Sequence, residues 1–160
     1  MSNSIKHLID QFNLQTRLFN NVTIGIGDDD AQKQLNSNTN HIAWLTGHIV
    51  STRFGLAKGL GLPVQEPFPE LFENQKGLDK QAKYPSMQEL TKDWNSLAEK
   101  IGNVLNSLTE EALQSKMPRT VPTGDTLGDL ICFLMHHEAY TIGQLGISRR
   151  FFGLEAMKYN

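Results

Sequence analysis

Apolar residues recur at steps of three and four over four long segments of this chain, which is the spacing of one helix face. Segments 4–23 and 38–60 carry two of these stripes. The most regular one starts after residue 86 and consists of Met87, Leu90, Trp94, Leu97, Ile101, Val104 and Leu108. In segment 126–153, the positions that share one face are Leu127, Leu130, Leu134, His137, Thr141, Gln144 and Ser148. The pattern predicts four amphipathic helices.

Capping signals predict where three of these helices begin. Ser86 is followed three residues later by Glu89, and Thr126 is followed in the same way by Asp129. In such a capping box, each side chain bonds a backbone N–H of the other residue. For the second helix, residues 37–38 are a serine and an asparagine, both suitable N-caps.

The connections predict how the four helices are ordered. Segment 63–85 holds four of the six prolines, lacks helical periodicity, and is long enough to cross from one end of a bundle to the other. The short links should make helices one and two, and helices three and four, antiparallel neighbours. We therefore expect an all-α fold: one domain over residues 1–160, a four-helix bundle with up-down-down-up order. Segment 109–113 reads as a short extra turn and segment 117–124 as a loop, with no strand pattern.

Composition narrows the class of protein. The chain has 160 residues and a net charge of −2, which argues against a nucleic-acid partner. Its single cysteine, Cys132, lies among apolar residues, so a buried thiol and a reducing compartment are expected. The first residues lack the pattern of a signal peptide, and no apolar run approaches the roughly 18 residues of a membrane span. We expect a cytoplasmic protein without a membrane partner.

Two of the five histidines are candidate metal ligands. His48 and His137 lie on the inward sides of the second and fourth helices, and a metal site in a bundle needs imidazole nitrogens that converge from facing helices. The third ligand is expected one helical turn after His137, but that position is Thr141. The remaining histidines, at positions 7, 41 and 136, are expected at the surface or rim.

Two segments resemble the DinB/YfiT-like superfamily: N-H-I-A-W-L-T-G-H at 40–48 and H-E-A-Y-T-I-G-Q-L-G-I-S-R-R-F-F-G-L at 137–154. In that family, a histidine late in helix two and an H-x-x-x-H-x-G-Q motif on helix four bind a divalent metal, usually zinc or nickel. The resemblance implies that His48 and His137 take the first two positions. Thr141 replaces the third histidine, while the following G-Q is retained at residues 143–144.

This replacement leaves the metal site incomplete. A threonine hydroxyl is a poor zinc or nickel ligand, and Glu138 points about 100° away from His137 around the helix. Zinc or nickel would be held weakly, and the absence of a tightly bound cofactor is the expected state. The alternative is that the two histidines hydrogen-bond each other, Thr141, Gln144 or a trapped water.

The function that follows is a small-molecule-binding bundle of unassigned activity. Its pocket is expected between the ends of the second and fourth helices, lined by Trp44, His48, His137, Tyr140, Thr141 and Gln144. The resemblance also implies a metal-dependent thiol transferase or hydrolase as an alternative. A third hypothesis is a structural, homodimeric interaction protein, since relatives form homodimers through bundle helices.

The Arg149-Arg150 pair is expected to stabilise the carboxyl end of its own helix.

Overall fold

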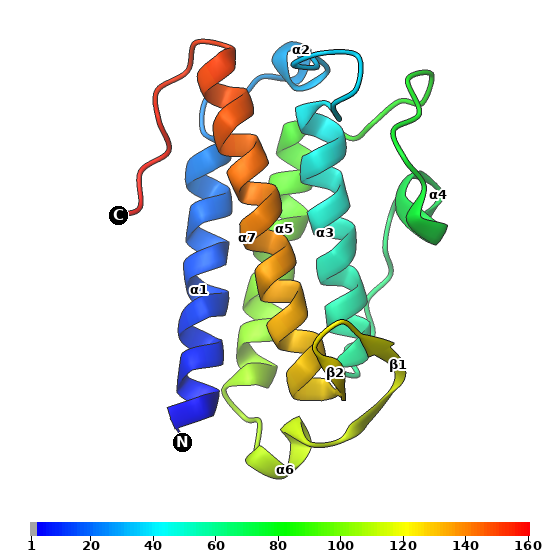
Figure 1. The fold of residues 1–160 in the computed structure, drawn as a ribbon, viewed down its shortest axis with the longest axis vertical. Helices are drawn as coiled ribbons and strands as arrows, with labels where there is room; N and C mark the ends of the chain where they lie inside the picture. The colour runs from blue at the N-terminus through cyan, green and yellow to red at the C-terminus, as the bar shows by residue number, and fades with distance from the viewer. Residues whose placement is uncertain (1–2) are drawn as a thin grey trace.

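Four long helices lie side by side in the computed structural model, which describes residues 3–160 (Figure 1). They are α1 (Asn3–Thr23), α3 (Ile42–Gly59), α5 (Met87–Leu105) and α7 (Leu127–Phe151). Helices α1 and α7 run up the view of Figure 1, while α3 and α5 run down, so the up-down-down-up order is confirmed.

The neighbours in the bundle differ from those predicted. Helix α1 packs against α5 and α7, and α3 packs against the same two helices. The pairs α1 with α3 and α5 with α7 therefore lie across the bundle diagonal. The prediction that these pairs are direct neighbours is wrong, because the links over residues 24–41 and 106–126 are long enough to cross the diagonal.

Both predicted capping boxes are present. Ser86 Oγ accepts from the backbone N–H of Glu89 at 3.2 Å, and the Glu89 carboxylate accepts from the backbone N–H of Ser86 at 2.9 Å. Thr126 and Asp129 make the same exchange at 3.2 and 3.0 Å. The first backbone N–H groups of a helix have no acceptor within the helix. Because the capping bonds supply one, they fix the starts of α5 and α7.

Helix α3 begins later than predicted and uses a different cap. His41 Nδ1 accepts from the backbone N–H of Trp44 at 2.9 Å, and the His41 side chain is buried against the edge of Tyr84. The expectations that the helix starts near residue 38 and that His41 lies at the rim are wrong. Burial lowers the pKa of His41, which keeps the imidazole neutral and able to accept this bond.

The connections contain short elements that the periodicity did not reveal. Helix α2 (Asp28–Ala31) follows α1, and Asp28 Oδ1 accepts from the backbone N–H of Met87, tying α2 to the start of α5 at 2.8 Å. The crossover carries α4 (Pro69–Phe72) and the short 3-10 helix η1 (Glu73–Gln75).

The crossover is held against α3 by a glycine. The ring of Phe72 rests directly on Gly47, where an added Cβ would collide with it. A glycine here permits this close approach of a side chain from the crossover.

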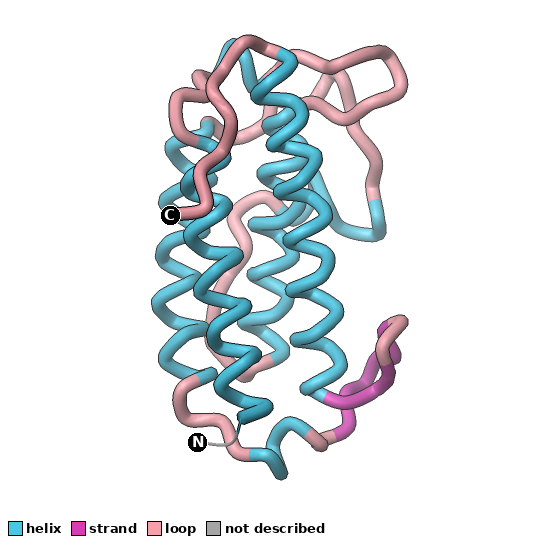
Figure 2. The backbone as a smooth tube through the Cα atoms, turned by 60° about the vertical axis from the view of Figure 1, so that its left-hand side comes forward, coloured by secondary structure: helices cyan, strands magenta, loops and turns pink. Residues whose placement is uncertain are grey.

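The predicted loop at 117–124 is instead a hairpin. After α6 (Glu110–Leu113), strand β1 (Lys116–Val121) pairs antiparallel with β2 (Gly124–Thr126), and Figure 2 shows the pair beside the lower end of α7. Gly124 has a φ of 147°, which glycine adopts without strain. Two prolines at positions 118 and 122 mask the strand signal, since proline is depleted from strand interiors.

An arginine and a glutamate meet in the middle of the bundle. Arg53 of α3 donates from Nε and Nη2 to the two carboxylate oxygens of Glu138 of α7, at 2.7 and 3.0 Å. The guanidinium carbon lies 3.2 Å from the ring centroid of Trp94 on α5 and 4.5 Å from that of Phe12 on α1. Both charged side chains are buried, so each of the four helices contributes to one buried contact.

This pair is a sensitive point of the core. Burial raises the pKa of the Glu138 carboxyl, and the positive charge of Arg53 opposes that shift. Two bonds in a fork and two aromatic faces compensate for lost hydration of the charges. Removing either partner would leave the other charged and unpaired in a dry interior.

Arg149 stabilises a helix end in addition to the one expected. Its Nη1 donates to the carbonyls of Val22 and Ile24 at 2.6 and 3.1 Å, and its Nε donates to the Glu155 carbonyl at 2.6 Å. Arg149 and Arg150 both lie in the last turn of α7, where a positive charge suits the helix dipole, and the Arg149 side chain in addition crosses to α1. The same contacts hold the C-terminal tail against the bundle.

Two expectations about the surface can be compared with the structure. Cys132 is exposed, which corrects the prediction of a buried thiol: it lies one residue after buried Ile131 and so points about 100° away around α7. Across residues 3–160, no helix has the length and apolarity needed to cross a bilayer.

We predict that Glu138→Gln lowers the free energy of unfolding by about 3–5 kcal/mol, because Arg53 stays charged without its partner. Urea denaturation measures this loss. Glu99→Gln, an exposed change on α5, is the matched control and should alter the free energy by less than about 0.5 kcal/mol.

Replacing both charges tests the cause. Arg53→Met combined with Glu138→Leu removes the unpaired charge and should recover most of the lost stability. A double variant as unstable as Glu138→Gln would contradict this account and assign the loss to packing instead.

Candidate functional site

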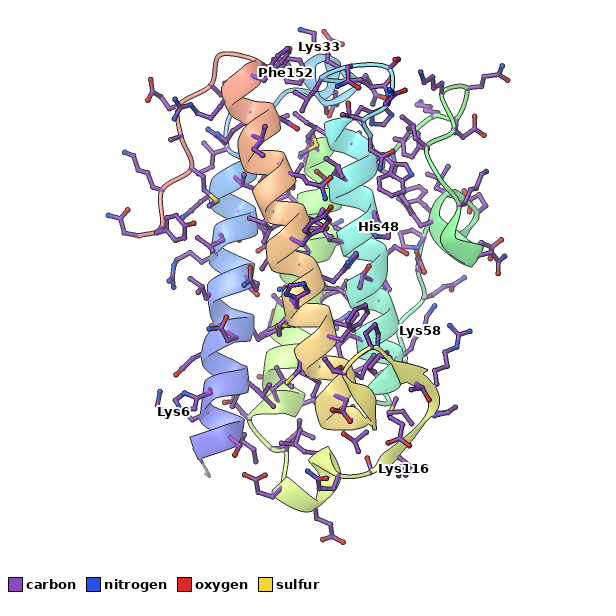
Figure 3. All side chains as sticks on the ribbon, in the orientation of Figure 1. Lys6, Lys33, His48, Lys58, Lys116 and Phe152 are labelled. Carbon is purple, nitrogen blue, oxygen red and sulfur yellow. The ribbon has the colours of Figure 1, made fainter. Side chains whose placement is uncertain are left out.

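His48 and His137 face each other across the seam between α3 and α7. Their Nε2 atoms are 2.9 Å apart, and the rings meet nearly edge to face, with centroids 4.9 Å apart and planes inclined by 82°. Both side chains are half-buried; Figure 3 labels His48 on α3. The structure thus brings together the two histidines that the sequence singled out, and we call them the histidine pair.

Aromatic rings flank the histidine pair. The Trp44 ring stacks on His48 with centroids 4.8 Å apart and planes inclined by 11°. The Phe133 ring stacks on His137 with centroids 6.2 Å apart and planes inclined by 22°. Phe72 from the crossover meets Trp44 edge-on. The pair therefore sits in a weakly polar environment that disfavours a charge.

The environment sets the protonation of the histidine pair. Burial lowers the pKa of His48 to about 4, and repulsion from His137 adds to this shift. Burial also lowers the pKa of His137, with a smaller contribution from His136. Both rings are neutral at pH 7, so one Nε2 carries a hydrogen and donates it to the other.

Thr141 does not extend the histidine pair. Its hydroxyl is buried and donates to the carbonyl of His137 at 3.0 Å, one turn back on the same helix. Tyr140, predicted to line the pocket, is 65% exposed on the outer face of α7, and that prediction is wrong. Adjacent helical residues are 100° apart, so a buried Thr141 leaves Tyr140 facing solvent.

The donor set does not complete the family's metal site. Two ligand nitrogens at 2.0–2.1 Å from a tetrahedral zinc lie roughly 3.3 Å apart, whereas these two are 2.9 Å apart and share a hydrogen bond. The nearest carboxylate on α7, Glu138, is engaged by Arg53. Within residues 3–160, no three histidine, cysteine or acidic side chains converge as a metal site would require. These residues fit a hydrogen-bonded pair better than a closed metal site.

Gln144, the last predicted pocket residue, lies at a separate hollow of about 290 Å³. This hollow, which we call the upper hollow, is lined by Leu35, Asn38, Thr39, Asn40, Leu45, Gln144, Ile147 and Ser148. Neither histidine of the pair lines it. The predicted pocket is thus divided, with the histidine pair and Trp44 in one place and Gln144 in another.

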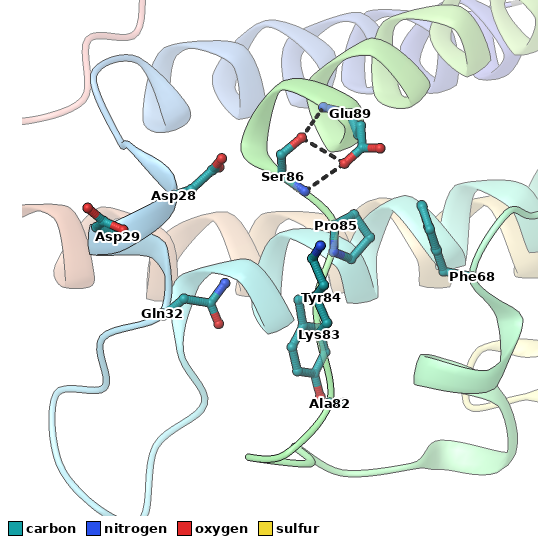
Figure 4. A pocket seen from close by; sticks show the side chains of 10 residues that line it. All are labelled: Asp28, Asp29, Gln32, Phe68, Ala82, Lys83, Tyr84, Pro85, Ser86 and Glu89. Carbon is teal, nitrogen blue, oxygen red and sulfur yellow. Dashed lines mark hydrogen bonds between the residues drawn. The ribbon is translucent and has the colours of Figure 1, made fainter.

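A larger hollow of about 680 Å³ lies where α2, the end of the crossover and the start of α5 meet (Figure 4). It holds none of the predicted site residues. Its carboxylates are partly used in capping: Asp28 caps the first amide of α5, and Glu89 completes the capping box. Sequence reasoning missed both this hollow and the Arg53–Glu138 pair, because neither has a spacing signal within one helix.

The histidine pair makes stability depend on pH. In the folded state the pKa of each histidine lies below the unfolded value of 6.5, so the unfolded state binds protons more tightly. The stability that the neutral pair contributes is therefore complete above pH 6.5. We predict that about 2–3 kcal/mol is lost as the pH falls from 6.5 towards about 4. Urea denaturation at a series of pH values measures this loss.

A variant without the pair isolates its contribution. His48→Gln combined with His137→Gln should reduce the pH dependence in this range to the part that buried His41 contributes, whereas His7→Gln on the exposed side of α1 should leave it unchanged. Equal slopes in the wild type and the double variant would contradict a neutral histidine pair.

Solved structures resemble this chain along almost its whole length. A DinB-like protein from Bacillus cereus superposes with a TM-score of 0.72 at 14% identity, covering 96% of this chain and 95% of that one. A DinB-like protein from Bacillus subtilis gives a TM-score of 0.61 at 19% identity, covering 98% and 96%. A conserved protein from Enterococcus faecalis gives 0.69 at 12% identity, covering 94% and 97%. At these identities the likeness shows the shared fold.

The sequence itself carries the family assignment. No curated protein matches the chain. The family profile of the DinB superfamily matches residues 11–145, which include α3 and α5 whole, most of α1 and α7, and the histidine pair. The chain belongs to the DinB superfamily.

Proposed function

We propose that this protein binds a small molecule at the seam between α3 and α7, with the histidine pair as a polar anchor and without a tightly held metal. The observation that carries the proposal is the direct bond between the two Nε2 atoms. A neutral ring that donates from Nε2 has an acceptor at Nδ1, and the ring that accepts has a donor there. The pair can therefore offer one donor and one acceptor to a ligand.

The surroundings of the pair support this role. Trp44 is half-buried and provides an aromatic face beside His48, while its Nε1 is buried and has no partner within the described residues. An unsatisfied buried N–H costs about 1–3 kcal/mol, so a bound molecule or water would stabilise this position. Aromatic faces with a few polar atoms are typical of small-molecule sites.

A metal-dependent thiol transferase or hydrolase is the competing proposal. It is favoured by the convergence of two of the family's three histidines on one point. A metal bound there would supply Lewis-acid activation of a thiol or water, with solvent or substrate completing its shell. Thr141, bonded to its own helix, does not supply the missing ligand.

Thr141→His separates these two proposals. Position 141 is one turn from His137, so an imidazole there can join the histidine pair. We predict that zinc and nickel bind on the order of 100-fold more tightly to Thr141→His than to the wild type, as measured by isothermal titration. Thr91→His is the control, because Thr91 also bonds a carbonyl one turn back but lies on α5.

Two outcomes would count against the proposal. Stoichiometric zinc or nickel in wild-type protein purified without chelator would contradict binding without a tight metal. Equal affinity in the wild type and Thr141→His would show that position 141 does not correspond to the family's third ligand.

A homodimer is supported by a separate surface. Three large apolar side chains on the outer face of α7 are about two-thirds exposed: Tyr140, Ile147 and Phe151, at steps of seven and four residues. Gly143, between them, is exposed and leaves room for close approach of another helix. We propose that a second copy of the chain covers this stripe, since a contiguous apolar stripe is typical of helix pairing.

We predict that the wild type is a dimer by light scattering and that Tyr140→Lys combined with Phe151→Lys is a monomer, because two charges would be buried at the contact. The control is Ile24→Lys, equally exposed but at the end of α1 and off the stripe. A monomeric wild type, or a dimer that survives the double change, would contradict the proposal.

A further inference from the structure

The upper hollow lies where the loop between α2 and α3 meets the upper part of α7. Gln144 lines it from α7 and Leu45 from the first turn of α3. Gln144 is two turns beyond His137, which places it about 10 Å further along the helix axis. The upper hollow and the histidine pair thus occupy the same seam at different heights.

The side chains of the upper hollow have hydrogen-bonding capacity that the protein does not use. Within residues 3–160, the side-chain amides of Asn38, Asn40 and Gln144 make no hydrogen bond. The hydroxyls beside them are used: Ser148 Oγ donates to the Gln144 carbonyl at 2.9 Å, and Thr39 Oγ1 donates to a carbonyl of its own loop at 3.0 Å. The unused donors and acceptors are therefore those of the three amides.

The lining also restricts the charge of a ligand. No acidic or basic side chain lines the upper hollow, so an ion held there would lose hydration without gaining a counter-charge. Each side-chain amide presents both a donor and an acceptor, which matches a carboxamide, a urea or a cyclic imide. Leu35, Leu45 and Ile147 provide apolar surface for a short aliphatic part.

We infer that the upper hollow binds a small neutral molecule that carries a carboxamide-like group, paired with Gln144 and the asparagines of the loop. A volume of about 290 Å³ corresponds to roughly ten water molecules at 30 Å³ each, and so to a ligand of about ten non-hydrogen atoms. The inference goes beyond the proposed function, because the histidine pair does not line the upper hollow.

Propionamide, propionate and propylammonium test the inference, because they share a similar size and differ in charge. Each is titrated into the ¹⁵N-labelled full chain while the side-chain amide signals of Asn38, Asn40 and Gln144 are followed by NMR. We expect saturable shifts of these signals with propionamide and none with either ion.

Gln144→Leu should weaken propionamide binding by about tenfold, since a hydrogen-bonded pair is lost while the helix is preserved. Asn103→Leu is the matched control, an exposed amide on α5 far along the chain, and should bind as the wild type does. If Gln144→Leu does not fold, Asn38→Ser on the exposed loop takes its place and should also weaken binding.

The results separate this inference from the proposed function. Equal response to the charged probes, or no saturable shift with any probe, would overturn the inference. NMR shifts at Trp44, His48 and His137 with unchanged Gln144 signals would also overturn the inference, and would leave the proposed function standing. Shifts at Gln144 without shifts at His48 and His137 would support the inference and leave the proposed function standing, because neither histidine lines the upper hollow.

Discussion

The buried contact between Arg53 and Glu138 is the constraint on which the rest of the structure depends. A forked pair of hydrogen bonds tolerates little sliding, so it fixes both the height and the rotation of α3 against α7. Trp94 and Phe12 close over the guanidinium from the other two helices. One polar contact in an apolar core thereby selects one arrangement of four helices among several that apolar stripes alone would allow.

The histidine pair follows from that arrangement. Once α3 and α7 are fixed, His48 and His137 meet on the more exposed side of the same seam, and the two polar contacts support one register. The chain has two of the three histidines that the resemblance implies, and Thr141, at the third position, donates to a carbonyl of its own helix. The two histidines hydrogen-bond each other.

Periodicity and capping signals were sufficient for the four helices, their order and the inward positions of His48 and His137. They describe which residues share a face of one helix, but not which helix that face meets. The diagonal placement of α1 with α3 and of α5 with α7, and the Arg53–Glu138 contact, depend on which helices meet. Tyr140 illustrates the limit at a single residue: its neighbour Thr141 is buried, and a rotation of 100° places it in solvent.

The contacts of Arg149 have a consequence for how the protein is made. The carbonyls that end α1 are bonded by a side chain 127 and 125 residues further along the chain. On the ribosome, the nascent first helix emerges long before this arginine is synthesised, and its end must stay bonded to water until then. Contacts between residues so distant in sequence form late and slowly. The end of the first helix therefore gains its hydrogen-bond donor only when a residue at least 125 positions later has been translated.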